Sequence, residues 1–359
     1  MCGRRGLVLA GLAVIAAIGV AVFLCSRDGL NGHSVAAPEL VVLGFEDQFP
    51  GAQRTAYFRP FTSETNVRVR DTTYEGDFEH LKERLRDEPP DVVQVDGSDL
   101  LRGVREDLFR PIDYRVVGKD DLLPQTAHEF GVGTDVYAIA MGWNLKKLPE
   151  GSSAPRAWSD FWDAKKYPGG RALKKSPRFT LEIALMADGV APGDLYKDGR
   201  LDVDRAFRKL DEIKPDVQLW WTDALQPARQ LADGEIVMAA ARGEKLFVAA
   251  HVENPPIELT WNQAVMGVHY WAVPRAARNP EQAMGFIAYA KLSHRQATFA
   301  TILPLGPVNP RAFGHIESGV SRWLNTHPEN LSRQVFLDQS WWAEHEEEVT
   351  RRFERWLRE

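Results

Sequence analysis

Short apolar runs alternate with amphipathic stretches along most of the chain, and this pattern predicts an α/β protein. Apolar runs of four to eight residues are typical of buried strands, whereas apolar positions spaced three or four apart indicate helices. The predicted strands are 40–43, 67–71, 91–95, 136–141, 171–173, 217–221, 235–241 and 270–273. The predicted helices are 54–65, 77–86, 180–188, 202–212, 226–233, 281–292, 294–300 and 340–358. Strands and helices therefore alternate in the order that builds a sheet flanked by helices.

Several predicted strands run directly into small polar loops. Phe45 and Asp47 follow the strand 40–43, Ser98 follows 91–95, and Arg242 and Glu244 follow 235–241. In open α/β sheets, ligands bind outside the carboxyl ends of the strands. These residues are therefore candidate ligand-binding residues, although solvated turns and a helix cap at Ser98 are the alternative interpretation.

The stretch 261–274 begins with aromatic and amide side chains and then becomes a short apolar strand that Pro274 ends. We interpret it as the place where the chain returns from a second lobe into the first. Trp261, His269 and Tyr270 would then lie across the join as ligand-binding candidates. A strand in a single-domain α/β protein is the alternative.

Composition excludes several classes of protein. A chain of 359 residues fits two domains, and its net charge of −6 without a basic stripe argues against a nucleic-acid partner. The two cysteines, Cys2 and Cys25, flank an N-terminal apolar run, which excludes a disulfide scaffold, a thiolate zinc site and a cysteine nucleophile. The histidines are scattered and no common catalytic motif occurs, so we expect no metal and no cofactor.

The N-terminus predicts export from the cytoplasm. Arg4 and Arg5 precede the unbroken apolar run 6–24, and polar residues follow it. The run is long enough to span a bilayer, so residues 1–37 are predicted to be an uncleaved membrane anchor or a cleaved export signal. Lipid attachment at Cys25 is a further alternative, although Leu24 is larger than that processing prefers. The expected location is periplasmic or otherwise extracytoplasmic.

The order of these pieces resembles the extracellular (periplasmic) solute-binding proteins of ABC transporters, in the branch that includes the spermidine/putrescine-binding proteins. The resemblance covers nearly everything from about residue 39 onward. It rests on the segments 74–77, 91–98, 158–162, 231–235, 261–263, 270–274, 306–310, 328–330 and 341–342.

This resemblance implies a type II periplasmic-binding-protein fold, with two lobes joined by a hinge and each lobe a mixed sheet flanked by helices. Lobe 1 would comprise 38–142 plus 265–313, and lobe 2 would comprise 143–264 plus 314–359. A small solute would be clamped between the lobes and delivered to an ABC permease in the inner membrane. The protein would act as a monomer and would not be an enzyme.

The polyamine-binding pattern that the resemblance implies is only partly present. Asp47 and Glu244 occupy acid positions, but His269 stands where an acid is typical just before the return strand. Leu305 replaces an expected tyrosine, and Ser176 lies where acids occur in one type of relative. A site with less negative charge disfavours spermidine and putrescine themselves. The expected solute is a polyamine-like or related amine or zwitterionic metabolite, smaller or less cationic than those two, or a carboxylated one.

Two other functions remain open from the sequence. A membrane-anchored sensory domain could keep the same ligand clamp and signal instead of transporting. A hydrolase could use Asp47, Asp96 or His269 as acid and base.

Overall fold

Eleven strands form the sheet at the centre of the computed structural model, which describes residues 38–253 and 255–359. The strands are β1 (Glu39–Phe45), β2 (Arg68–Tyr74), β3 (Val92–Asp96), β4 (Phe109–Arg110), β5 (Ala127–His128), β6 (Gly131–Asn144), β7 (Arg171–Lys174), β8 (Val217–Trp221), β9 (Met238–Arg242), β10 (Ile257–Pro274) and β11 (Val335–Phe336). This mixed sheet flanked by helices agrees with the predicted α/β fold class.

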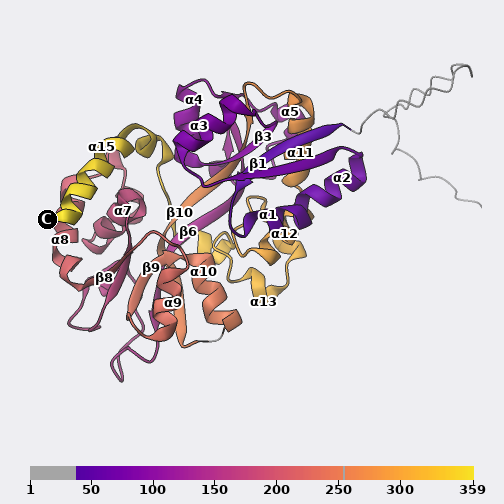
Figure 1. Cartoon of the computed structure of the whole chain (residues 1–359). Coiled ribbons are helices and arrows are strands. Elements are labelled where there is room, and N and C mark those ends of the chain that lie inside the picture. Colours follow the sequence, from indigo (N-terminus) through magenta and orange to yellow (C-terminus); the bar gives the residue numbers. More distant parts are fainter. Residues whose placement is uncertain (1–37, 254) are drawn as a thin grey trace, which may run out of the picture. The chain divides into compact units, whose positions relative to one another are not determined.

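Helices cover the sheet and connect its strands (Figure 1). The α-helices are α1 (Phe49–Gln53), α2 (Arg59–Thr65), α3 (Phe78–Asp87), α4 (Gly97–Arg105), α5 (Tyr114–Val117), α6 (Trp158–Trp162), α7 (Pro177–Ala187), α8 (Val203–Ile213), α9 (Gln226–Asp233), α10 (Gly243–Val248), α11 (Pro280–Ala290), α12 (Ser293–Ile302), α13 (Ser318–Ser321), α14 (Pro328–Leu331) and α15 (Gln339–Arg358). The π and 3₁₀ turns are η1 (Arg54–Phe58), η2 (Pro124–Thr126), η3 (Pro192–Asp194), η4 (Lys197–Gly199), η5 (Lys214–Asp216), η6 (Ala249–Glu253) and η7 (Pro310–His315).

The sheet consists of two groups of parallel strands joined by an antiparallel pair. Its order is β2-β1-β3-β10-β6-β9-β7-β8. Strands β1, β2 and β3, the first group, run parallel to one another, and so do β7, β8 and β9, the second group. Between the groups lie β10, antiparallel to β3, and β6, antiparallel to β9. Figure 1 shows β6 and β10 running diagonally between the two groups.

The joining strands are longer than the sequence predicts. The apolar pattern marks only 136–141 and 270–273, whereas β6 has 14 residues and β10 has 18. In β6 the pattern is interrupted by Thr134 and Asp135, which are buried but hydrogen-bonded and so remain inside the sheet. In β10 it is interrupted at a bulge between Thr260 and Val265.

The bulge in β10 is held from outside the sheet. Gln263 has a left-handed φ of 60°, and its side-chain oxygen accepts from the backbone nitrogen of Trp158 at 3.0 Å. The indole nitrogen of Trp158 donates to the Gln263 carbonyl oxygen at 2.7 Å. The start of α6 therefore fixes the irregular backbone where β10 passes from one half of the sheet to the other.

Two local expectations from the sequence need correction. Ser98 does not cap α4, because the Asp96 carboxylate accepts from the Ser98 backbone nitrogen and Asp96 is the capping residue. The residue spacing in 340–358 also predicts an aromatic and apolar stripe on one helix face, with Glu347 paired to Arg351 and Glu348 to Arg352. The C-terminal helix α15 buries most of this stripe, and Glu347 pairs with Arg351. Arg352, however, pairs with Asp204 on α8 at 2.6 Å instead of with Glu348, since α15 packs beside that helix.

The predicted export signal or anchor, including the run 6–24 and Cys25, lies outside the described residues. Within residues 38–253 and 255–359, no helix has the length and apolar character needed to cross a membrane. The predicted lobe boundaries at 142 and 264 fall near the end of β6 and at the β10 bulge. They stay a prediction.

Substitution of Gly267 by alanine should destabilise the protein, because Gly267 lies opposite Tyr137 in the β6–β10 pair. A Cβ atom at Gly267 would lie 2.3 Å from Cζ of Tyr137, so the ring would have to move. We expect Gly267→Ala to lower the free energy of unfolding by about 1–3 kcal/mol, measured by urea denaturation.

The matched control is Gly285→Ala in α11, where a Cβ would meet nothing within 4 Å. Because alanine favours helix over glycine by about 1 kcal/mol, this variant should be as stable as the parent or more so. Equal urea midpoints for the two variants would contradict the close packing of Tyr137 on β10.

Candidate functional site

A cavity of about 470 Å³ lies where the carboxyl ends of the strands of both groups meet. It is lined by Phe45, Glu46, Asp47, Gln48, Phe49, Glu75, Gly76, Asp96, Asp99, Tyr137, Lys174, Arg178, Ala224, Arg242, Glu244, Lys245, His269, Leu303 and Leu305. Of these, Phe45, Asp96, Lys174 and Arg242 are the last residues of β1, β3, β7 and β9. The sheet topology thus creates the ligand position that the strand-end rule anticipates.

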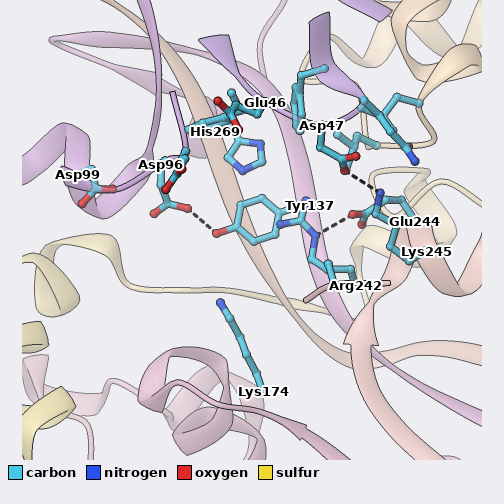
Figure 2. Close-up of a pocket in the computed structure, with 18 of the residues that line it drawn as sticks. Glu46, Asp47, Asp96, Asp99, Tyr137, Lys174, Arg242, Glu244, Lys245 and His269 are labelled. Carbon is cyan, nitrogen blue, oxygen red and sulfur yellow. Dashed lines mark hydrogen bonds and ion pairs between the residues drawn. The ribbon is translucent and has the colours of Figure 1, made fainter. Parts of the chain in front are cut away.

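The charges in the cavity are divided between its two sides. The ends of β1, β2 and β3 and the residues that follow them supply carboxylates: Glu46, Asp47, Glu75, Asp96 and Asp99. The ends of β7 and β9 and the residues that follow them supply the cations Lys174, Arg178, Arg242 and Lys245, with the single carboxylate Glu244 among them. Figure 2 shows the acids and cations converging on Tyr137 and His269. One side of the cavity is therefore mainly anionic and the other mainly cationic.

Tyr137 and His269 project into the cavity from the two joining strands. Their rings stack at 4.4 Å between centroids with an interplanar angle of 23°. The edges and faces of Phe45 and Phe49 surround the imidazole at 5.0 and 5.6 Å. These aromatic surfaces can pack against methylene groups or a ligand cation.

The carboxylate of Asp135 orients the imidazole of His269. Its Oδ1 lies 2.8 Å from Nδ1 of His269, and its Oδ2 accepts from the Thr134 hydroxyl at 2.5 Å. A buried carboxylate accepts hydrogen bonds, so Nδ1 carries a proton and Nε2 is the nitrogen through which the ring can meet a ligand. The amide of Gln94 donates to Thr134 and Asp135 and extends this buried network.

Arg178 makes two largely buried ion pairs in the site. Its guanidinium lies 2.7 Å from Asp96 and 3.1 Å from Glu346, and it also donates to the Ser98 hydroxyl. Burial by itself would raise the pKa of Asp96, but Arg178, His269 and the Tyr137 hydroxyl outweigh it and hold that pKa well below its usual range. Asp96 is therefore a carboxylate at neutral pH.

The backbone around Arg178 is strained. Phe179 is fully buried with φ 73° and ψ −40°, a conformation that non-glycine residues rarely adopt. This turn precedes the regular part of α7 and carries the Arg178 guanidinium to Asp96. The hydrogen-bonded ion pairs and the burial of the Phe179 ring are what hold the strained turn in place.

The second arginine of the cavity is paired within its own loop. Nε of Arg242 donates to Glu244 at 2.8 Å, and its guanidinium lies 4.1 Å from the Tyr137 ring centroid. Lys245 reaches Asp47 across the cavity at 3.4 Å, but the Asp47 side chain is 65% exposed. We expect that exposed pair to contribute little.

The structure brings together five of the residues that the sequence predicts as ligand-binding: Phe45, Asp47, Arg242, Glu244 and His269 all line the cavity. The remaining four do not line it. Ser98 lies beneath the cavity between Asp96 and Arg178, and Ser176 precedes α7.

The two aromatic candidates, Tyr270 and Trp261, are buried and pack within the protein instead of lining the cavity. Tyr270 alternates to the other face of β10 and donates its hydroxyl to the Gln125 carbonyl oxygen at 2.8 Å. Trp261 lies against Gly243, where a Cβ would be 2.3 Å from its ring, and so supports the turn that begins α10.

Sequence reasoning missed Tyr137, Lys174, Arg178 and Glu75. The basic loop 174–178 follows the strand 171–173, so the rule that located Arg242 would also have selected Lys174. Tyr137 lies inside an apolar strand and gives no such signal.

Neither a hydrolase nor a metal centre is favoured by this geometry. The cavity lining contains no serine, threonine or cysteine among the described residues. Asp96 is held by Arg178, and His269 is held by Asp135. Within the described part of the chain, no cluster of histidine, cysteine and acidic side chains could hold a metal ion.

Comparison with known proteins agrees with the resemblance. Residues 56–320 match the family described as bacterial extracellular solute-binding protein. The chain belongs to this family. The chain is 36% identical over 345 residues to the gamma-aminobutyric acid-binding protein of Pseudomonas aeruginosa, and the match covers 92% of this chain and 96% of that protein.

Two solved solute-binding proteins share the fold. An ABC transporter substrate-binding protein from Bradyrhizobium japonicum is 30% identical with a TM-score of 0.82, over 89% of this chain and 99% of that chain. The Atu4243–GABA receptor is 29% identical with a TM-score of 0.80, over 89% and 97%. The type II periplasmic-binding-protein fold is thereby confirmed. The Bradyrhizobium japonicum relative is described as the substrate-binding protein of an ABC transporter, and the family is one of solute-binding proteins rather than of enzymes.

Removal of the Arg178 guanidinium should destabilise this solute-binding protein. Arg178→Met leaves Asp96 and Glu346 without their shared cation, so we expect a loss of about 3 kcal/mol at pH 7. Without Arg178, the folded-state pKa of Asp96 should rise above its unfolded value. Protonation then relieves the cost, and the deficit measured by urea denaturation should shrink from pH 7 to pH 5.

Arg115→Met is the matched control, because Arg115 makes a 2.7 Å pair with Asp113 on the surface, where its side chain is 90% exposed. Its unfolding free energy should change by less than about 1 kcal/mol. A deficit in Arg178→Met that is as small, or independent of pH, would contradict the buried pair.

Proposed function

We propose that this protein captures a small ω-amino acid, 4-aminobutyrate (GABA) or a close homologue, and delivers it to an ABC permease. The observation that carries the proposal is the division of charge in the cavity, with acids after β1, β2 and β3 and cations after β7 and β9. A zwitterion has one charge for each side. A site that pairs with both charged ends of the ligand would bind a zwitterion more tightly than an amine or a simple carboxylate, which can pair with one side only.

The aromatic centre of the cavity supports a short aliphatic spacer. Phe45, Phe49 and Tyr137 surround His269, and methylene groups would remove apolar surface from water there. The ligand ammonium would lie toward Glu46 and Glu75 and the carboxylate toward the cationic side.

The relatives support the same ligand class. The Pseudomonas aeruginosa protein and the Atu4243 structure are both described with GABA. A polyamine fits less well, because Lys174, Arg178, Arg242 and Lys245 would repel its second ammonium group.

Capture would involve two lobes, made from the two groups of parallel strands and joined by β6 and β10. The β10 bulge between Thr260 and Val265 is a suitable place for backbone rotation, because strand pairing is interrupted there. Ligand binding would favour the closed arrangement, which the permease of the inner membrane would recognise. The family is extracellular, so this capture would take place outside the cytoplasm.

Isothermal titration calorimetry with three ligands of matched length tests the proposal. GABA should bind with a roughly micromolar Kd, whereas putrescine, with two ammonium groups, and butyrate, with none, should bind at least about a hundredfold more weakly. At a GABA concentration about a hundred times Kd, the free energy of unfolding should rise by about 2.7 kcal/mol. Binding of putrescine as tight as that of GABA would overturn the zwitterion assignment.

A further inference from the structure

Within the described part of the chain, Lys174 is the cation of the cavity that makes no ion pair with a carboxylate. Arg178 pairs with Asp96 and Glu346, Arg242 pairs with Glu244, and Lys245 pairs with Asp47. No ion pair to Lys174 is present among residues 38–253 and 255–359. Its ammonium group lies 4.9 Å from the centroid of the Phe179 ring, a cation–π contact.

The position of Lys174 faces the ligand space. It is the last residue of β7 and lines the cavity, and Figure 2 shows its ammonium group pointing toward Tyr137. Its neighbour Lys175 is exposed and does not line the cavity. Lys175 lies one residue beyond the end of β7, so the strand positions only Lys174 at the cavity.

Charged groups from four elements act on Lys174. Arg178 on α7 and Arg242 at the end of β9 repel its proton, while Asp96 at the end of β3 and Glu346 on α15 attract it. Tyr137 faces it from β6 with a pKa that burial raises well above the usual value, so this hydroxyl is neutral. Burial and the two arginines outweigh the carboxylates and lower the pKa of Lys174 to about 7.

We propose that Lys174 receives the carboxylate of the bound ligand as an ammonium group and takes up a proton from the solvent when the ligand binds. A carboxylate placed beside Lys174 supplies the counter-charge that the empty cavity lacks. The protonated form is then favoured in the complex more than in the free protein. This inference rests on the proposed function and identifies the residue that selects the acidic end of the ligand.

The affinity for GABA should fall as pH rises above 7. Near pH 7 a substantial fraction of empty sites holds a neutral amine, and that fraction grows as pH rises. Each of these sites must bind a proton together with the ligand. The Kd for GABA should therefore increase by up to about tenfold per pH unit above pH 7 and should level off below it.

Asp99 is a second titrating group in the same cavity. Burial raises its pKa to about 7, with Arg178 opposing the rise and Asp96 and Glu346 adding to it. Its deprotonation at higher pH would also disfavour a ligand carboxylate, so a pH slope alone does not identify Lys174. The Lys174→Arg variant separates the two, because an arginine stays charged throughout this range while Asp99 is unchanged.

The experiment is calorimetric titration of the full chain with GABA at pH 6.5, 7.5 and 8.5, in two buffers of different ionisation enthalpy at each pH. The wild type should take up a fraction of a proton at pH 7.5 and close to one at pH 8.5. Lys174→Arg should lose most of this uptake and most of the pH slope. Lys174→Met should bind GABA at least about tenfold more weakly at pH 6.5, and Lys175→Met should behave as the wild type.

The thermal stability of the protein without ligand tests whether the charge of Lys174 is unpaired. In the folded state the pKa of Lys174 lies below its unfolded value, so the lysine destabilises the fold most at pH 6 and less as pH rises toward 10. The Tm of Lys174→Met should exceed that of the wild type by a few degrees at pH 6, and the difference should shrink by pH 9.

Proton uptake that persists in Lys174→Arg would overturn the inference and assign the effect to Asp99 or another group. A flat Kd in the wild type would overturn it as well. If GABA and its homologues fail to bind at any pH, the proposed function falls, and the thermal comparison still decides whether Lys174 carries an unbalanced charge.

Discussion

The antiparallel pairing of β6 with β10 is the interaction on which the cavity depends. Its register runs from Ile257 opposite Asn144 to Trp271 opposite Val132, broken by the β10 bulge. Strands β3 and β9 hydrogen-bond to opposite sides of this pair. The carboxyl ends of both parallel groups consequently open onto the same space, and the pair itself contributes Tyr137 and His269 to its centre. Loops from remote parts of the chain form one site because two strands are long enough to belong to both halves.

Charge placement in the cavity is a compromise between stability and recognition. Buried charges cost free energy unless they are paired and hydrogen-bonded, and most of those here are. Arg178 satisfies Asp96 and Glu346, and Arg242 satisfies Glu244 while covering the Tyr137 ring. These pairs hold the walls in one arrangement. Recognition of a charged ligand needs the opposite property, a buried charge whose partner is absent until the ligand arrives.

The sequence predicts the fold well where the determinants are local. Strand β8 and helix α9 agree to the residue with prediction, since Gly234 takes the left-handed conformation that ends the helix. The loop residues after β1 and β9 could be selected because strand ends are visible in the apolar pattern. Arg178 could not, because it meets Asp96, 82 positions earlier, only through the strained turn at Phe179. Tryptophan often contacts ligands, so Trp261 could be selected from the sequence. In the folded protein its ring packs against Gly243 instead.

Strain and uncompensated charge occur in the same short segment, between Lys174 and Phe179. Each lowers the stability of the empty protein, and neither the ammonium group of Lys174 nor the turn at Phe179 takes part in the strand pairing of the sheet. A ligand can change the population of a closed form only through interactions that the open, empty form lacks. A fully paired cavity would have nothing left to offer a carboxylate beyond what water offers. In the proposed mechanism, the ammonium group of Lys174 would gain its carboxylate partner only when the ligand binds. The free energy of that pairing would then be available to drive closure of the two lobes.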